Sequence, residues 1–187
     1  VDETQTLSPR VIKVGDPVPK GGVYKLGDPY VAAGKWYVPV NDQAYDQVGI
    51  ASWYGDFFHG RRTANGEIYD MNALTAAHPT LPMPTYATVT NLENNRTIVV
   101  RINDRGPYHD GRIIDLSHRA AELLGFYPKG SGPVRVRYLS SAPLNGDDSL
   151  ERTTLAKQPW SPRVVRDKQA RAAPPPSPKA SFLAAAT

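Results

Sequence analysis

The sequence predicts a mainly β fold, a small closed β-barrel with one or two short helices. Three observations predict it. Short segments of alternating and β-branched residues crowd into residues 48–140. Proline and glycine occur 18 and 15 times in 187 residues, which is typical of many turns and few long helices. Closure into a barrel would also remove the exposed edges that such short strands otherwise leave.

The expected elements follow in chain order. Strands are expected at residues 48–53, 86–92, 97–102, 113–116 and 134–139. Because the turn sequence at 93–96 lies between the second and third of them, these two strands should form a hairpin. Ser117 is placed to cap the start of a helix at 118–124, and Gly125 is placed to end it.

Two flanking regions differ from the middle in composition. Residues 1–47 are rich in Pro, Gly and Tyr, and we expect an irregular N-terminal extension that packs on the barrel, with a short hairpin around Gly34. Residues 141–187 hold seven prolines and many alanines, which predicts a disordered Pro/Ala-rich linker or tail. A protein-docking segment anchored by Trp160 and Phe182 is the alternative for that tail. The predicted division is therefore 1–47, 48–140 and 141–187.

Composition excludes several classes of protein. The chain has no cysteine, so disulfide scaffolds, Cys-ligated zinc and thiol catalysis are excluded. No stretch reaches the ~18 to 20 apolar residues that a membrane span needs. His59, His109 and His118 lack Glu or Asp at metal-ligand spacing. At a net charge of +4, no basic patch interleaved with aromatic residues is present. We expect no metal, no cofactor and no nucleic-acid partner.

Three polar clusters are candidates for chemistry, at residues 61–70, 75–82 and 101–107. Between them they hold Glu67, Asp70, His78 and Asp104. Each residue also has a plainer interpretation, as a turn cap, a packing histidine or a member of a structural ion pair. Serine-esterase and phosphate-loop motifs are absent. Carboxylates with one histidine suit general acid–base catalysis on glycosidic bonds.

Five motifs occur together in a fixed order, at residues 49–55, 58–67, 75–82, 100–107 and 112–117. As a set they closely resemble the rare lipoprotein A family, bacterial septal lytic transglycosylases with a six-stranded double-psi β-barrel. The resemblance covers residues 48–139. The segments at 24–30 and 34–37 also look like that family's N-terminal extension, which supports the expected hairpin.

The resemblance implies a polysaccharide lyase. Such enzymes cleave the β-1,4 bond between N-acetylmuramic acid (MurNAc) and N-acetylglucosamine (GlcNAc), leave 1,6-anhydro-MurNAc ends, prefer glycan strands without stem peptides, and act in cell-wall remodelling and daughter-cell separation. It carries over the catalytic positions Asp104, Glu67, Asp70 and His78. Expected to hold the sugars are Tyr54, Arg62, Asn65, Asn103 and Arg105. The alternative function is a non-catalytic, expansin-like peptidoglycan-binding module.

The resemblance also implies a place in the cell and a set of partners. The expected location is the periplasm of a Gram-negative bacterium, as an outer-membrane lipoprotein whose anchoring cysteine lies upstream of Val1. The expected partners are peptidoglycan glycan strands and septal cell-wall proteins, with a monomeric chain. Many family members end in a septal peptidoglycan-binding domain, and residues 141–187 are too few and too Pro/Ala-rich to form one.

A transglycosylase can use a single acid, because the 6-hydroxyl of MurNAc attacks its own C1. We expect Asp104 in this role, with Glu67 as the competitor. The acid must be protonated when substrate binds, so its pKa must be raised. We therefore expect the Arg105 guanidinium to point away from Asp104 and either Glu67 or Asp70 to lie close to it. His78 should hydrogen-bond a carboxylate or the glycan.

Overall fold

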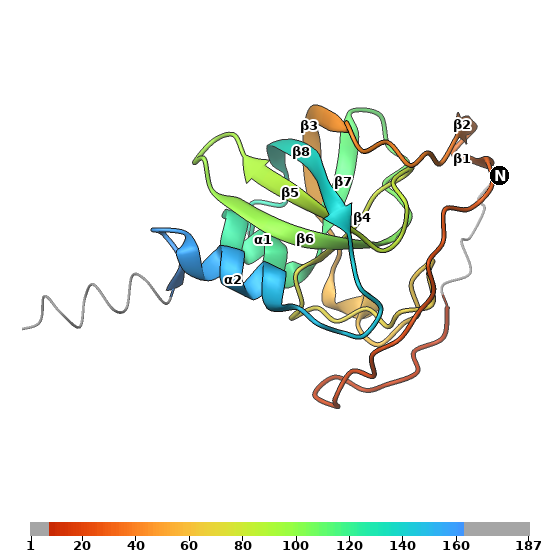
Figure 1. The fold of residues 1–187 in the computed structure, drawn as a ribbon, viewed down its shortest axis with the longest axis horizontal. Helices are drawn as coiled ribbons and strands as arrows, with labels where there is room; N and C mark the ends of the chain where they lie inside the picture. Colours follow the sequence, from red (N-terminus) through yellow and green to blue (C-terminus); the bar gives the residue numbers. More distant parts are fainter. Residues whose placement is uncertain (1–7, 163–187) are drawn as a thin grey trace, which may run out of the picture.

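Six strands close into a barrel in a computed structural model, which describes residues 8–162 (Figure 1). Around the barrel the order is β3-β7-β4-β6-β5-β8. Two neighbouring pairs, β3–β7 and β4–β6, are parallel and the other four are antiparallel. This is the expected mainly β, six-stranded barrel. Its strands are β3 (Asp46–Trp53), β4 (Thr75–Ala77), β5 (Thr85–Asn91), β6 (Thr97–Asp104), β7 (Arg112–Leu116) and β8 (Gly132–Ser141).

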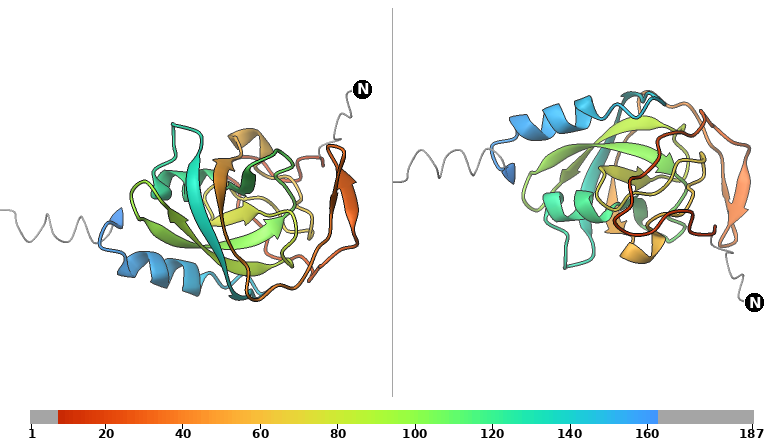
Figure 2. Two further views of the ribbon diagram at one scale, coloured as in Figure 1. Left: turned by 90° about the horizontal axis from the view of Figure 1, so that it is seen from above. Right: turned by 90° about the horizontal axis from the view of Figure 1, so that it is seen from below.

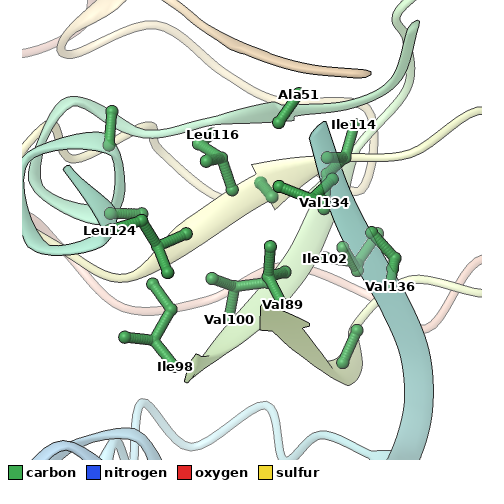
Figure 3. Packing of buried hydrophobic residues seen from close by; sticks show 14 of the residues in the cluster. Ala51, Val89, Ile98, Val100, Ile102, Ile114, Leu116, Leu124, Val134 and Val136 are labelled. Carbon is green, nitrogen blue, oxygen red and sulfur yellow. The ribbon is translucent and has the colours of Figure 1, made fainter. Parts of the chain in front are cut away.

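The barrel interior is filled by aliphatic side chains that alternate along the strands (Figure 3). Val89, Ile102 and Val136 are among the fully buried members of this core. The helix α1 (His118–Leu124) closes one end with Leu123 and Leu124. Its ends are as expected: the Ser117 hydroxyl accepts from the N–H of Ala120, and Gly125 ends the helix at a φ of 89°.

One strand and one α-helix were not expected from the sequence. Strand β4 is only Thr75–Ala77, and two alanines carry little strand signal, yet it is buried between β6 and β7. Helix α2 (Ser149–Lys157) lies within the region predicted to be a tail and packs along β6 (Figure 2). Residues 149–157 contain no proline, so the proline-rich composition of residues 141–187 as a whole does not apply to this helix. Residues 163–187, including Phe182, lie outside the described part of the chain.

The N-terminal extension packs on the barrel as a strap and a hairpin. Strands β1 (Tyr30–Ala32) and β2 (Lys35–Tyr37) pair around Gly34, as expected, and stand beside the barrel (Figure 2). Their inner rings, Tyr30 and Tyr37, pack against Tyr108. The segment before them, residues 8–29, forms the strap. Backbone hydrogen bonds connect it to the loops at Gly60, Asn65 and Met83. A single-turn 3-10 helix, Asp56–Phe58, lies among these loops. No helix in residues 8–162 is long and apolar enough to cross a membrane.

Candidate active site

Strand register brings two aspartates to one level of the barrel. Ala77 of β4 is the partner of Asp104 on β6 and of Asp115 on β7. The two aspartates therefore lie two strand spacings apart, about 10 Å between Cα atoms. Both line one cavity of about 610 Å³. Its other walls come from the loop after β3, the loop at 61–64 and the turn at 105–109, and include Tyr54, Phe58, Arg61, Arg62, Ala64, Tyr69, Arg105, Tyr108, His109 and Arg112.

Asp104 is the half-buried acid of this cleft. Its Oδ1 accepts hydrogen bonds from the backbone N–H groups of Ala64, at 3.0 Å, and Arg105, at 2.9 Å. Burial raises the pKa of Asp104 to about 6, and the charge of Asp115 adds to this. The two N–H donors and the Arg105 charge oppose the rise without cancelling it. A carboxyl with this pKa can be protonated near neutral pH, which a general acid requires.

Asp115 is the second carboxyl in the cleft, and the sequence reasoning did not single it out. Burial raises its pKa, while a hydrogen bond and ion pair from the Arg112 guanidinium act in the opposite direction. The signal that could have found it is an acid inside an apolar strand, in the run Ile113-Ile114-Asp115-Leu116. Such an acid needs either a partner or a function.

The surroundings of Asp104 differ from the expectation in the carboxyl that acts on it, and Arg105 forms no side-chain hydrogen bond to it among the contacts of residues 8–162. The Arg105 guanidinium donates to the carbonyls of His78, Leu81 and Leu26 rather than to the Asp104 carboxyl, although its charge still lowers the pKa of Asp104. The carboxyl whose charge acts on Asp104 is Asp115 rather than Glu67 or Asp70. The sequence could not show this, because barrel register decides which strand ends meet.

Glu67 lies outside the cleft, in a buried polar network. Its carboxylate accepts from the Arg101 guanidinium and from Asn103 Nδ2 at 2.8 Å. It lines a separate small cavity of about 70 Å³, together with Asp70, Arg101 and Asn103, where Val18–Gly21 of the strap form one wall. Asp70 accepts the N–H of Asn72 through Oδ1, as a turn cap does.

His78 is buried and organises the turn after β4. Its Nδ1 accepts the N–H groups of Thr80 and Leu81, each at 3.1 Å, so Nε2 carries the ring hydrogen. Burial, helped by the Arg105 charge, lowers its pKa to about 3, so the ring stays neutral. The expected hydrogen bond to a carboxylate is not among the contacts of the described residues. The backbone of His78 instead contacts both site residues: its N–H donates to the Asp104 carbonyl, and its carbonyl accepts from Arg105.

The predicted sugar-binding residues divide into two groups. Tyr54, Arg62 and Arg105 line the cleft with Asp104. Tyr54 packs edge-on against Tyr69, with ring centroids 4.8 Å apart. Asn65 and Asn103 are buried instead: Asn65 bridges the 63–67 turn to Val23, and Asn103 holds Glu67. Within residues 8–162, no three His, Asp or Glu side chains gather closely enough to hold a metal ion.

Comparison with known proteins found relatives of the barrel. A family model described as "Lytic transglycolase" matches residues 46–138, the barrel. The protein named endolytic peptidoglycan transglycosylase RlpA of Pseudomonas aeruginosa PAO1 is 53% identical over 121 residues, which cover 64% of this chain and 35% of that protein. The RlpA of Rickettsia bellii is 40% identical over 158 residues, which cover 79% of this chain and 70% of that protein.

Among solved structures, an expansin from Clavibacter michiganensis aligns at a TM-score of 0.41 and 18% identity, covering 53% of this chain and 52% of that one. The chain thus spans about a third of the Pseudomonas relative and over two thirds of the rickettsial one.

Proposed function

The chain belongs to the RlpA family of peptidoglycan transglycosylases, and on that premise we propose that it is an endolytic lytic transglycosylase itself. It would cleave the β-1,4 bond between MurNAc and GlcNAc in strands without stem peptides and leave 1,6-anhydro-MurNAc ends. The observation that carries the proposal is Asp104, a half-buried carboxyl with its pKa raised to about 6 in a sugar-sized cleft.

In the proposed reaction one carboxyl acts twice. Protonated Asp104 gives its proton to the bridging oxygen as the bond from MurNAc C1 to that oxygen breaks. The MurNAc 6-hydroxyl forms the new bond to C1, and its proton passes to the Asp104 carboxylate. The acid is thereby regenerated without water. Because the nucleophile belongs to the same sugar, its effective concentration is high and no second carboxyl has to activate it.

Asp115 and its Arg112 partner set the charge around this acid. Ionised Asp115 favours the protonated form of Asp104. Its negative charge would also stabilise the positive charge that develops at C1 in the transition state. The two carboxyls of the cleft therefore have different proposed roles: Asp104 transfers the proton, and Asp115 provides a fixed negative charge.

We assign Glu67 and His78 a positioning role in this reaction. Glu67 holds Asn103, the residue before Asp104, and its backbone closes the 63–67 turn that presents the Ala64 N–H to Asp104. His78 fixes the turn whose backbone contacts Asp104 and Arg105. Loss of either side chain would move the acid or its N–H donors, although neither side chain lines the cleft.

The curated relatives that carry the RlpA name come from Gram-negative bacteria such as Pseudomonas aeruginosa. A wall-cleaving enzyme of such a cell acts in the periplasm. We propose that location, with an outer-membrane lipid anchor, a role in cell-wall remodelling and daughter-cell separation, and septal wall proteins as partners of a monomeric chain.

The test is mass spectrometry of peptide-free glycan strands after incubation with the protein. Anhydro-MurNAc ends support the proposal, reducing ends indicate a hydrolase, and intact strands indicate a binding module. Asp104→Asn should abolish anhydro ends while leaving the fold intact. The matched control is Asp110→Asn, an exposed acid of the neighbouring loop, which should retain activity. Undiminished release by Asp104→Asn would remove Asp104 from the mechanism.

A further inference from the structure

The arginines that line the cleft outnumber its aspartates. Its lining includes four arginines, Arg61, Arg62, Arg105 and Arg112, against two aspartates. If Asp104 holds a proton, Asp115 is the remaining anion. A neutral sugar polymer gains little from such an excess, whereas a polymer with carboxylates is attracted by it.

Two of the four guanidiniums are already committed. Arg112 is paired with Asp115, and Arg105 donates to three backbone carbonyls. Arg61 and Arg62 form no ion pair with a carboxylate in residues 8–162. Among the described residues, they are the arginines of the cleft that remain for a ligand.

Arg61 is already fixed in place. Its Nε donates to the Phe57 carbonyl at 3.1 Å, its Nη1 donates to the Ser8 carbonyl at 2.6 Å, and its guanidinium stacks on the Phe57 ring, 4.4 Å from the centroid. Arg62 is more exposed and donates through Nη1 to the Gly66 carbonyl at 3.1 Å. A guanidinium has five N–H donors, so both side chains keep most of theirs for a ligand.

The proposed substrate offers one type of anion. Every MurNAc carries a lactyl ether on O3, whose carboxyl is free when no stem peptide is attached and becomes a neutral amide when one is. We propose that Arg61 and Arg62 bind the free lactyl carboxylate of the MurNAc residue at the cleavage site. Guanidinium and carboxylate can form paired, charge-assisted hydrogen bonds, which an amide cannot match.

The position of the pair fits this ligand. Ala64, two residues after Arg62, donates its N–H to Asp104, so the loop that carries the arginines also holds the acid. The sugar attacked at C1 is the MurNAc itself, and its lactyl group lies on the same ring. A stem peptide would remove the charge that the arginines recognise and add bulk beside them. The inference rests on the proposed function and names the residues that select peptide-free strands.

The test compares two forms of one substrate. Peptide-free strands are used as isolated, or after carbodiimide coupling of the lactyl carboxyl to methylamine. For the unaltered protein, kcat/KM should be about tenfold or more higher for the acid form, since a charge-assisted pair is lost on amidation. The loss should fall mainly on KM, because this carboxylate takes no part in the bond changes at C1.

The variants then locate the recognition. In Arg62→Gln, and in Arg61→Gln combined with it, the ratio of kcat/KM between the two forms should fall toward one, and Arg62→Lys should keep part of it. Arg137→Gln, an exposed arginine on β8 outside the cleft, should keep the full ratio. Arg62 is exposed, and within residues 8–162 its side chain donates one hydrogen bond, to the nearby Gly66 carbonyl, so Arg62→Gln should fold even if Arg61→Gln does not.

The outcomes separate the two proposals. If the unaltered protein cleaves neither form, the proposed function fails. If it cleaves both forms equally well, or if the ratio survives in the arginine variants, the function stands and the carboxylate assignment is overturned.

Discussion

Replacement of Asp115 by asparagine tests whether its charge tunes the proposed acid. Asp104 and Asp115 flank Ala77 on neighbouring strands, about 10 Å apart at their Cα atoms. At that separation two unit charges interact by about 0.4 kcal/mol in water and about 1.7 kcal/mol at an effective dielectric constant of ~20. One pKa unit is about 1.4 kcal/mol, so removing the Asp115 charge should lower the pKa of Asp104 by ~0.3 to 1.2 units.

The sign follows from the role of the acid. Asp104 must be protonated to act, so kcat/KM falls as pH rises through its pKa, which lies at about 6 in the unaltered protein. Asp115→Asn should move this fall to lower pH by ~0.3 to 1.2 units. The substitution also leaves the Arg112 charge without its partner, which shifts the pKa in the same direction.

The assay is the pH profile of kcat/KM for release of anhydro-MurNAc ends. Arg112→Gln provides the opposite control, because loss of a nearby positive charge should move the same fall to higher pH. An unmoved profile in Asp115→Asn, or one moved to higher pH, would refute the assigned coupling between the two carboxyls.

Three further expectations concern the supports of the site and the core. Glu67→Gln leaves the buried Arg101 guanidinium without its carboxylate and should lower the free energy of unfolding by about 3 kcal/mol, measured in urea. Gly22→Ala places a Cβ 2.5 Å from Glu67 Cγ at a φ of 121°, so limited proteolysis should cut the strap faster than in Gly34→Ala, whose Cβ meets open space. Ile102→Ala removes a fully buried side chain from the barrel core and should cost about 3 kcal/mol, seen as a lower Tm.

The sequence predicted the barrel strands well wherever alternation was strong. Residues 86–92 and 97–102 form β5 and β6 with small shifts at their ends, because β-branched residues there alternate between the core and the outer face. Strand β4 was not predicted because two of its three residues are alanine. Its strand conformation comes from pairing with β6 and β7. Helix α2 is likewise stabilised by its packing on β6.

Some residues of the candidate site could be predicted from the sequence, but not which of them lie close together. Asp104 could be found because it follows a strand at a Gly-Pro turn, where a strand end commonly presents a side chain to a cleft. Its position beside Asp115 could not be found. The two residues are 11 positions apart in sequence, and they come to one level only because β4 lies between β6 and β7 in the barrel. The burial that makes His78 neutral is a property of the folded barrel as well.

These positions also explain why one acid can carry the proposed reaction while several polar residues surround it. Glu67 accepts from Asn103, the residue before Asp104, as well as from Arg101, and His78 holds the turn whose carbonyl accepts from Arg105, the residue after Asp104. Burial makes the ionised form of a carboxyl unfavourable, so the surrounding structure must hold the carboxyl in its buried position. The buried network outside the cleft supplies that support. Substitutions in it should therefore lower stability and activity together, whereas Asp104→Asn should lower activity alone.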